Sequence, residues 1–146
     1  MSGSGRVLGI DFGRRRIGLA LSDSLRMVAT PLETVDGESP KKATRRIREV
    51  LAEQDVGEIV VGLPLHMNGD PSELSEEAKA FGEKLGKQVP GLRVYLWDER
   101  MSSVQAERAL QLGGARASRK KEMRDQLAAQ LILQSWLDAQ GGQTAP

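Results

Sequence analysis

The sequence predicts an α/β domain built on one mixed, five-stranded sheet flanked by helices. Three strand-like segments follow one another near the N-terminus, and helix-like and strand-like segments then alternate. The predicted strands cover residues 7–12, 17–21, 27–35, 58–62 and 92–97. A chain of 146 residues is the size of one domain. We expect that domain to span residues 6–140, between a flexible N-terminus (1–5) and a flexible tail (141–146).

The strand pattern also predicts where the strands lie. Residues 7–12 alternate, so Leu8 and Ile10 point to one face of the sheet while Gly9 and Asp11 point to the other. Because Gly9 has no side chain, the face beside Asp11 is open to a bulky neighbour. Pro31 predicts that the third strand lies at a sheet edge or carries a bulge. The run 58–62 is apolar on both faces, which is typical of a central parallel strand.

Four helices are predicted, the first three of them from a capping signal. Ser39 precedes Pro40, a hydroxyl cap followed by proline at the first helical position, and that helix ends at about Gln54. Asp70 repeats the signal, with Glu73 completing a capping box, and its helix ends before Pro90. A third helix is predicted to begin at Ser102 and the last one to run from Ser118 to about Gln140.

Composition excludes several kinds of site. The chain has no cysteine and a single histidine, His66, so thiolate and multi-histidine zinc sites are excluded. Any catalytic metal must then be bound by oxygen, which favours Mg²⁺ or Mn²⁺. The N-terminus lacks a signal-peptide pattern and no stretch is long and apolar enough to span a bilayer. We therefore expect a cytoplasmic protein with no membrane partner.

The net charge is +1, but the charges are distributed in patches. Basic residues gather at 14–16, 41–48 and 116–124, and acidic residues at 73–83. Such patches are typical of a face that binds a polyanion, although solvated helix faces give the same pattern. The last basic cluster, which contains Lys121, leads directly into Asp125. Lys121 is therefore a candidate substrate-binding residue.

Three acidic residues form the candidate catalytic site. Asp11 and Glu99 each close an apolar strand-like run, and Asp125 stands at the head of a helical stretch. If the two strands are neighbours and the helix packs across them, the three carboxylates converge as hard oxygen ligands for divalent metal. Asp11 is the candidate bridging ligand, because a central strand holds it most rigidly. Strand alternation allows at most one of Asp98 and Glu99 to join Asp11 directly, and Asp98 is kept as a candidate that supports the metal ligands without binding the metal.

Other polar and aromatic residues near these carboxylates have two interpretations each. Arg16 and Arg100 are candidates to bind a substrate phosphate, or to hold a carboxylate in a structural ion pair. His66 follows a central strand and either approaches substrate or is simply exposed. Tyr95 and Trp97 stack on bases or, as their strand spacing favours, pack in the core.

Four motifs occur in a fixed order over residues 6 to about 138. They read DFGRRRIGLA at 11–20, VVGLP at 60–64 followed by Gly69, DER at 98–100 followed by two serines, and DQLAA at 125–129 followed by ILQ. In this respect the chain resembles the YqgF family, also called RuvX, of pre-16S ribosomal RNA nucleases. It departs from the family at 70–73, where members often carry a further glycine.

The resemblance implies a ribonuclease H-like fold related to the RuvC resolvases and a metal-dependent nuclease site. On the family pattern the catalytic, metal-binding carboxylates are Asp11, Glu99 and Asp125. It also implies a role in 5′-end processing of precursor 16S ribosomal RNA during ribosome biogenesis, with structured RNA as substrate and pre-ribosomal particles as partners. The choice of Mg²⁺ or Mn²⁺, endo- or exonucleolytic cleavage, and monomer or homodimer are left open.

Three other functions are compatible with parts of the sequence. A Holliday-junction resolvase in DNA recombination or repair would cut branched DNA, and usually acts as a symmetric dimer. An actin-like ATPase also opens with a strand, an aspartate and a glycine, but needs two such domains around its nucleotide. A non-catalytic RNA-binding ribosome-assembly factor would not need all three carboxylates.

Overall fold

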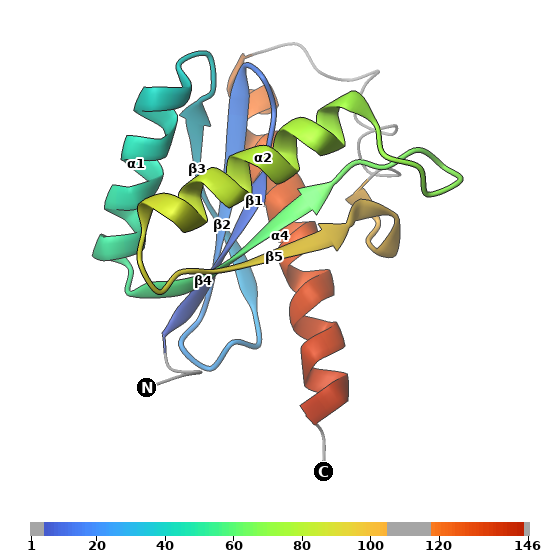
Figure 1. Ribbon diagram of the computed structural model, residues 1–146. Coiled ribbons are helices and arrows are strands. Elements are labelled where there is room, and N and C mark those ends of the chain that lie inside the picture. Colours follow the sequence, from blue (N-terminus) through green and yellow to red (C-terminus); the bar gives the residue numbers. More distant parts are fainter. Residues whose placement is uncertain (1–4, 105–117, 145–146) are drawn as a thin grey trace.

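The computed structural model describes residues 5–104 and 118–144. Along the chain, its elements are β1 (Arg6–Asp11), β2 (Arg16–Ser22), β3 (Ala29–Asp36), α1 (Pro40–Glu53), β4 (Val56–Leu63), α2 (Glu73–Gln88), β5 (Arg93–Asp98), the 3₁₀ turn η1 (Glu99–Met101) and α4 (Ser118–Thr144) (Figure 1). The strands form one sheet in the order β3-β2-β1-β4-β5. The first three pair antiparallel, while β4 runs parallel to both β1 and β5. The predicted mixed five-stranded sheet and its central parallel strand are confirmed.

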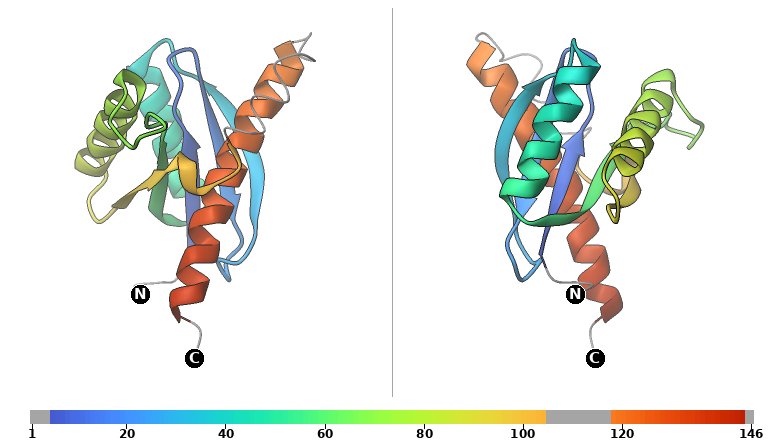
Figure 2. Two further views of the ribbon diagram at one scale, coloured as in Figure 1. Left: turned by 90° about the vertical axis from the view of Figure 1, so that its right-hand side faces the viewer. Right: turned by 60° about the vertical axis from the view of Figure 1, so that its left-hand side comes forward.

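Helices cover both faces of the sheet. Helices α1 and α2 lie on one face and α4 crosses the other (Figures 1 and 2). The alternation predicted for β1 divides its side chains between two cores. Leu8 and Ile10 belong to the core under α1 and α2, whereas Val7 belongs to the core under α4. Asp11 therefore lies on the α4 face, as the pattern predicted.

Strand β3 is the edge strand that Pro31 predicted. Its pairing with β2 changes register between Leu19, which faces Glu33, and Ala20, which faces Pro31. The extra residue forms a bulge at the proline, which has no backbone N–H to donate.

The first helix cap is where the sequence predicted it, and the second is not. At α1, the Ser39 Oγ accepts a hydrogen bond from the Lys42 N–H at 3.4 Å. At α2 the cap is Ser72, which exchanges hydrogen bonds with Ser75, so the predicted box of Asp70 and Glu73 was wrong. Asp70 belongs instead to the preceding loop, where Asn68 donates to its carboxylate at 3.0 Å. A local loop hydrogen bond at Asp70 thus accompanies a cap two residues further along the chain.

Helix α4 packs unusually close to the sheet because the strands beneath it carry glycines. A Cβ added to Gly9 would lie 2.7 Å from the Leu133 Cβ. One added to Gly18 would lie 2.0 Å from the Asp125 carbonyl oxygen. These distances are too short for any side chain, so the helix approaches to the backbone of β1 and β2.

Hydrogen bonds on both sides fix the rotation of α4 about its axis. Three glutamines at four-residue spacing bind β3 and the segment before it: Gln126 Nε2 to Thr34 Oγ1 at 3.1 Å, Gln130 Nε2 to the Ala29 carbonyl at 2.9 Å, and Gln134 Nε2 to the Met27 carbonyl at 2.9 Å. On the β5 side, the Trp97 Nε1 donates to the Ser135 Oγ at 3.0 Å. Residues four apart lie on one helix face, so the glutamines act together.

The last helix begins at Ser118 as predicted, and continues to Thr144 rather than ending near Gln140. At the predicted third helix, the Ser102 Oγ lies 3.4 Å from the Val104 N–H, and the remainder, from residue 105, is outside the described residues. Within the described ranges, no helix combines the length and apolarity that a bilayer crossing requires.

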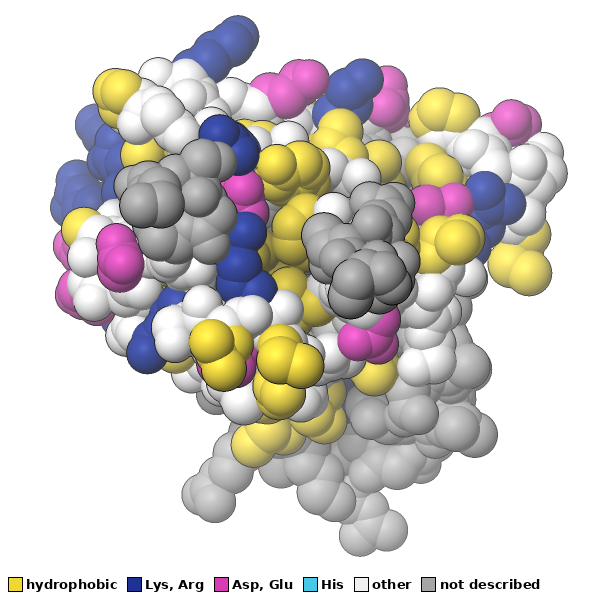
Figure 3. All heavy atoms as spheres, turned by 90° about the horizontal axis from the view of Figure 1, so that it is seen from below, with side chains coloured by type: hydrophobic (Ala, Val, Ile, Leu, Met, Phe, Trp, Pro, Cys, Tyr) yellow, Lys and Arg dark blue, Asp and Glu magenta, His cyan; other side chains and the backbone are white. Residues whose placement is uncertain are grey.

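The β2–β3 connection lies at the opposite end of β2 from Arg16 and carries exposed apolar side chains. Leu25, Met27 and Val28 are all exposed, and Figure 3 shows apolar side chains gathered on this lower face. Beneath them the buried Glu58 carboxylate forms an ion pair with Arg26. An ionic contact therefore ties this connection to β4.

The close approach of α4 predicts that Gly18→Ala destabilises the fold. The added methyl group overlaps the Asp125 carbonyl, so α4 must move away, and we expect a loss of about 1–3 kcal/mol in the free energy of unfolding. Gly57→Ala is the matched control, because a Cβ at Gly57 meets nothing within 4 Å. Urea unfolding of both variants measures the difference. Equal stability of the two variants would contradict the close packing.

Candidate active site

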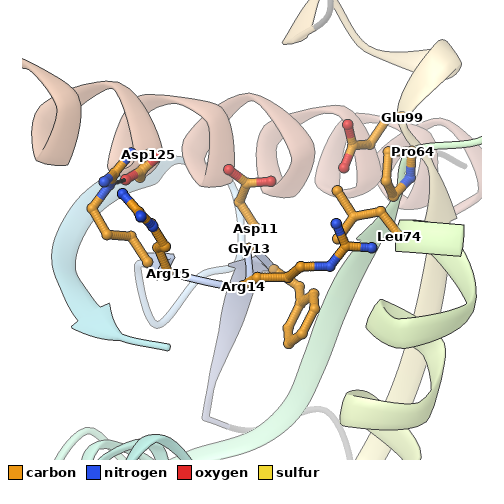
Figure 4. Close-up of a pocket in the computed structure, with 10 residues that line it drawn as sticks. Asp11, Gly13, Arg14, Arg15, Pro64, Leu74, Glu99 and Asp125 are labelled. Atoms are coloured by element: carbon orange, nitrogen blue, oxygen red, sulfur yellow. Dashed lines mark hydrogen bonds and ion pairs between the residues drawn. The ribbon is translucent and has the colours of Figure 1, made fainter. Parts of the chain in front are cut away.

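Two buried carboxylates lie on the α4 face at the ends of β1 and β5, which are not the neighbouring strands expected from the sequence. Asp11 is the last residue of β1 and 6% exposed, and Glu99 follows β5 and is 1% exposed. Strand β4 runs between them, and its residue at this level is Gly62. A Cβ on Gly62 would lie 2.9 Å from the Glu99 Oε2, so the Glu99 side chain extends over β4 where a larger residue would stand. Figure 4 shows the Asp11 and Glu99 carboxylates projecting to the same side of the sheet.

The third carboxylate, Asp125, reaches the same pocket from α4. Its backbone stands over Gly18, which is paired with Asp11 in the β1–β2 register. Its Oδ2 accepts a hydrogen bond from the Arg16 Nε at 2.7 Å. The three acidic residues line one open pocket of about 350 Å³, together with Phe12, Gly13, Arg14, Arg15, Arg16, Pro64 and Leu74.

The three carboxylates share the pocket without forming a ready-made metal cluster. In the described ranges, no three His, Asp or Glu side chains lie close enough together to hold one ion. Asp125 is instead engaged by Arg16. All three residues line one pocket, and their role as metal ligands stays a prediction.

Arg14 and Arg15 add positive charge to the rim of the pocket. Arg14 crosses to α2, where its Nε lies 3.0 Å from the Glu77 Oε1 and its Nη2 lies 2.5 Å from the Oε2. These hydrogen bonds lower the pKa of the Glu77 carboxyl. Sequence reasoning treated Arg14 only as part of a basic run. Its contact with α2 joins residues 63 positions apart, for which the local pattern gives no signal.

Arg100 takes the structural alternative offered by the sequence. Its Nη2 lies 2.7 Å from the Asp98 Oδ2, and its Nη1 donates to the Met67 carbonyl at 3.0 Å. Neither Arg100 nor Asp98 is among the described residues that line the pocket. The hydrogen bonds from Arg100 lower the pKa of the Asp98 carboxyl. This pair fixes the loop after β4 against the end of β5.

The remaining sequence candidates lie elsewhere. His66 is exposed in the loop after β4 and is not among the described pocket residues. Tyr95 packs on Trp136 with ring centroids 5.1 Å apart, and Trp97 packs against the core under α4, so the core interpretation of both aromatics is confirmed. The side chain of Lys121 lies outside the described residues.

The sequence reasoning missed two residues that shape the site, Gly18 and Gly62. Each leaves space beside Asp11 for a neighbouring element, Gly18 for α4 and Gly62 for the Glu99 side chain. The available signal was a glycine within each apolar strand run, which often marks a close approach.

The strand order, the helix across one face and the carboxylates at strand ends are those of a ribonuclease H-like fold. Two solved structures share this fold over nearly the whole chain. Thermus thermophilus RuvC in complex with a Holliday junction matches with a TM-score of 0.60 at 23% identity, covering 97% of this chain and 98% of that one. A second Thermus thermophilus RuvC structure matches with a TM-score of 0.54 at 22% identity, covering 94% and 96%.

The chain belongs to the RuvX family, whose model, described as "Holliday junction resolvase", matches residues 5–139. A protein of Endomicrobium trichonymphae is 44% identical, covering 92% of this chain and 96% of its own length. One of Agathobacter rectalis is 42% identical, covering 91% and 94%. Both carry the name "Putative pre-16S rRNA nuclease". The predicted family, fold and class of enzyme, a phosphodiester-cleaving hydrolase, are confirmed.

The Asp98–Arg100 pair predicts a specific pH dependence of stability. Because the folded-state pKa of Asp98 is lowered, its stabilising contribution is complete above the unfolded pKa of about 3.9 and is lost as the pH falls through the folded value. Asp98→Asn removes this contribution. We expect the variant to be slightly less stable than the wild type near neutral pH, with the difference vanishing in acid. Urea unfolding from pH 2 to 7 measures the stability difference between the two proteins. A difference that stays constant with pH would contradict the proposed role of the Asp98–Arg100 pair.

Proposed function

We propose that this protein is a divalent-metal-dependent nuclease that trims the 5′ end of precursor 16S ribosomal RNA. The observation that carries the proposal is the pair of buried carboxylates, Asp11 and Glu99, in a pocket edged by three consecutive arginines. The names of the relatives support the substrate. The proposal includes pre-ribosomal particles as partners and the cytoplasm as the location.

The chemistry of the pocket suits a hard divalent cation. Its candidate ligands are all carboxylate oxygens, from Asp11, Glu99 and Asp125, the donor type that Mg²⁺ and Mn²⁺ prefer. When bound, such an ion activates a water and stabilises the charge that develops on the leaving oxygen. Asp11 and Glu99 would hold it from the sheet and Asp125 from α4. Ligands on a strand end and a helix are rigidly placed, as this chemistry requires.

The arginine rim provides the groups that bind the nucleic-acid backbone. Arg14, Arg15 and Arg16 follow Asp11 directly and all line the pocket. A guanidinium donates two parallel hydrogen bonds to a phosphate and keeps its charge at any physiological pH. The scissile phosphate would then lie between these arginines and the carboxylates. Lys121, near the start of α4, remains a candidate for a further backbone contact.

A second candidate function is resolution of branched DNA. The family model is described by that activity, and the RuvC match is to a complex with a Holliday junction. Cutting a junction symmetrically needs two active sites, which a homodimer supplies. Trimming of ribosomal RNA requires only one active site. The oligomeric state and the preferred substrate therefore distinguish the two functions.

The active-site assignment predicts that Asp11→Asn and Glu99→Gln each lower the cleavage rate by more than about 100-fold, since each removes a charged metal ligand. Asp98→Asn is the control, because Asp98 is acidic and adjacent to Glu99 but outside the pocket. The assay uses labelled precursor 16S RNA with Mg²⁺, Mn²⁺ or EDTA. Loss of activity in the control but not in the two variants would overturn the assignment.

The substrate assignment predicts faster cleavage of precursor 16S RNA than of a four-way DNA junction, generic single-stranded RNA or generic duplex RNA at equal concentration. Sedimentation of the same preparation gives the oligomeric state. Preferred cleavage of the junction by a dimer would favour the resolvase. Absence of metal-dependent cleavage of every substrate would favour a binding factor without catalysis.

A further inference from the structure

The Arg16–Asp125 ion pair joins a proposed phosphate-binding residue to a proposed metal ligand. We propose that Arg16 and a divalent cation compete for the Asp125 carboxylate, so that metal binding releases the Arg16 guanidinium to the substrate phosphate. The inference rests on the proposed metal site and concerns how that site is assembled. Before metal binds, Arg16 is then a positioning residue for Asp125. After metal binds, Arg16 contacts the substrate.

The pair is accessible from the pocket. The Arg16 Nε donates to the Asp125 Oδ2 at 2.7 Å, and the two side chains are 38% and 23% exposed. Both residues line the pocket that also contains Asp11 and Glu99. A partly solvated pair of this kind is weak compared with a sealed one, because water screens the charges and replaces the lost hydrogen bonds. An ion entering the pocket therefore meets Asp125 in an exchangeable contact.

Only the Asp125 side chain has to move for the exchange. Its carbonyl would lie 2.0 Å from a Cβ on Gly18, so the helix backbone is already seated on β2. The next residue, Gln126, is fixed to the Thr34 Oγ1 at 3.1 Å. Figure 4 shows Asp125 and Asp11 on the same side of the sheet, facing one pocket. On this proposal a side-chain rotation redirects the carboxylate while α4 stays in place.

The positive charges of Arg16 and the cation oppose their simultaneous contact with Asp125. A guanidinium stays protonated, so it cannot yield Asp125 to a cation by losing its own charge. With the cation bound at Asp125, the guanidinium is repelled from that carboxylate and attracted to an anionic phosphate. Metal and substrate binding are then positively coupled, and the coupling is reciprocal. Each ligand raises the affinity for the other through one side chain.

The test is Mn²⁺ binding by the full chain without substrate, measured by calorimetry for the wild type, Arg16→Gln and Arg15→Gln. Arg15 is the matched control: it lines the same pocket and carries the same charge, and its side chain has no ion pair among the described residues. We expect Arg16→Gln to bind Mn²⁺ roughly three- to tenfold more tightly than Arg15→Gln, since one charge-assisted hydrogen bond no longer competes. Asp125→Asn should abolish this difference.

Equal or weaker Mn²⁺ binding by Arg16→Gln than by Arg15→Gln overturns the competition. If Arg16→Gln does not fold, as judged by thermal unfolding, the competition is tested on the wild type by NMR. The NMR signal of the Arg16 Nε–H should shift, and its exchange with water should accelerate, on saturation with Mg²⁺. A bound metal that leaves this signal unchanged overturns the inference alone. Absence of metal binding at the pocket overturns both the inference and the proposed metal site.

Discussion

The site depends on the close contact between α4 and the strands beneath it. Glycines at positions 9, 18 and 62 leave no side chains between the helix and the centre of the sheet, although the flanking positions Val7 and Val60 are filled. The helix is therefore near enough for a short aspartate side chain to enter a pocket formed by strand ends. Larger residues at these glycines would overlap α4 and push it away from the sheet. The distance between α4 and the strands thus follows from missing side chains rather than from specific bonds.

Close packing determines how near α4 lies to the sheet, whereas polar contacts determine the rotation of α4 about its axis. Each helical residue turns by about 100°, so a rotation equivalent to one residue would remove Asp125 from the pocket. Gln126, Gln130 and Gln134 prevent that rotation on the β3 side, and Ser135 prevents it on the β5 side. Because these groups are polar, their hydrogen bonds are directional, and an apolar interface of equal area would specify the rotation less strictly.

The parts of this fold that local physics determines were predictable from the sequence. Alternation placed Asp11 on the correct face, and Pro31 marked the edge strand. The cap at Asp70 was wrong because its side chain had a competing partner in the loop, which propensity does not include. For Arg16, the sequence offered a substrate phosphate or a structural ion pair with a carboxylate. Its observed partner is 109 residues away, and only the packing of α4 brings it near.

The β1–β2 loop links the pocket to helices on both faces of the sheet. Arg14 binds Glu77 of α2, and Arg16 binds Asp125 of α4, while Arg15 between them has no ion pair within the described part of the chain. The pocket is therefore less positive than its three arginines suggest, because carboxylates already neutralise two of them. A backbone phosphate therefore competes with a carboxylate at both guanidinium groups. Arg14 can exchange Glu77 for a phosphate directly, since both partners are at the surface. On the proposal above, Arg16 exchanges Asp125 for a phosphate when a cation binds Asp125. The phosphate contact of Arg16 then depends on the cation, whereas that of Arg14 does not.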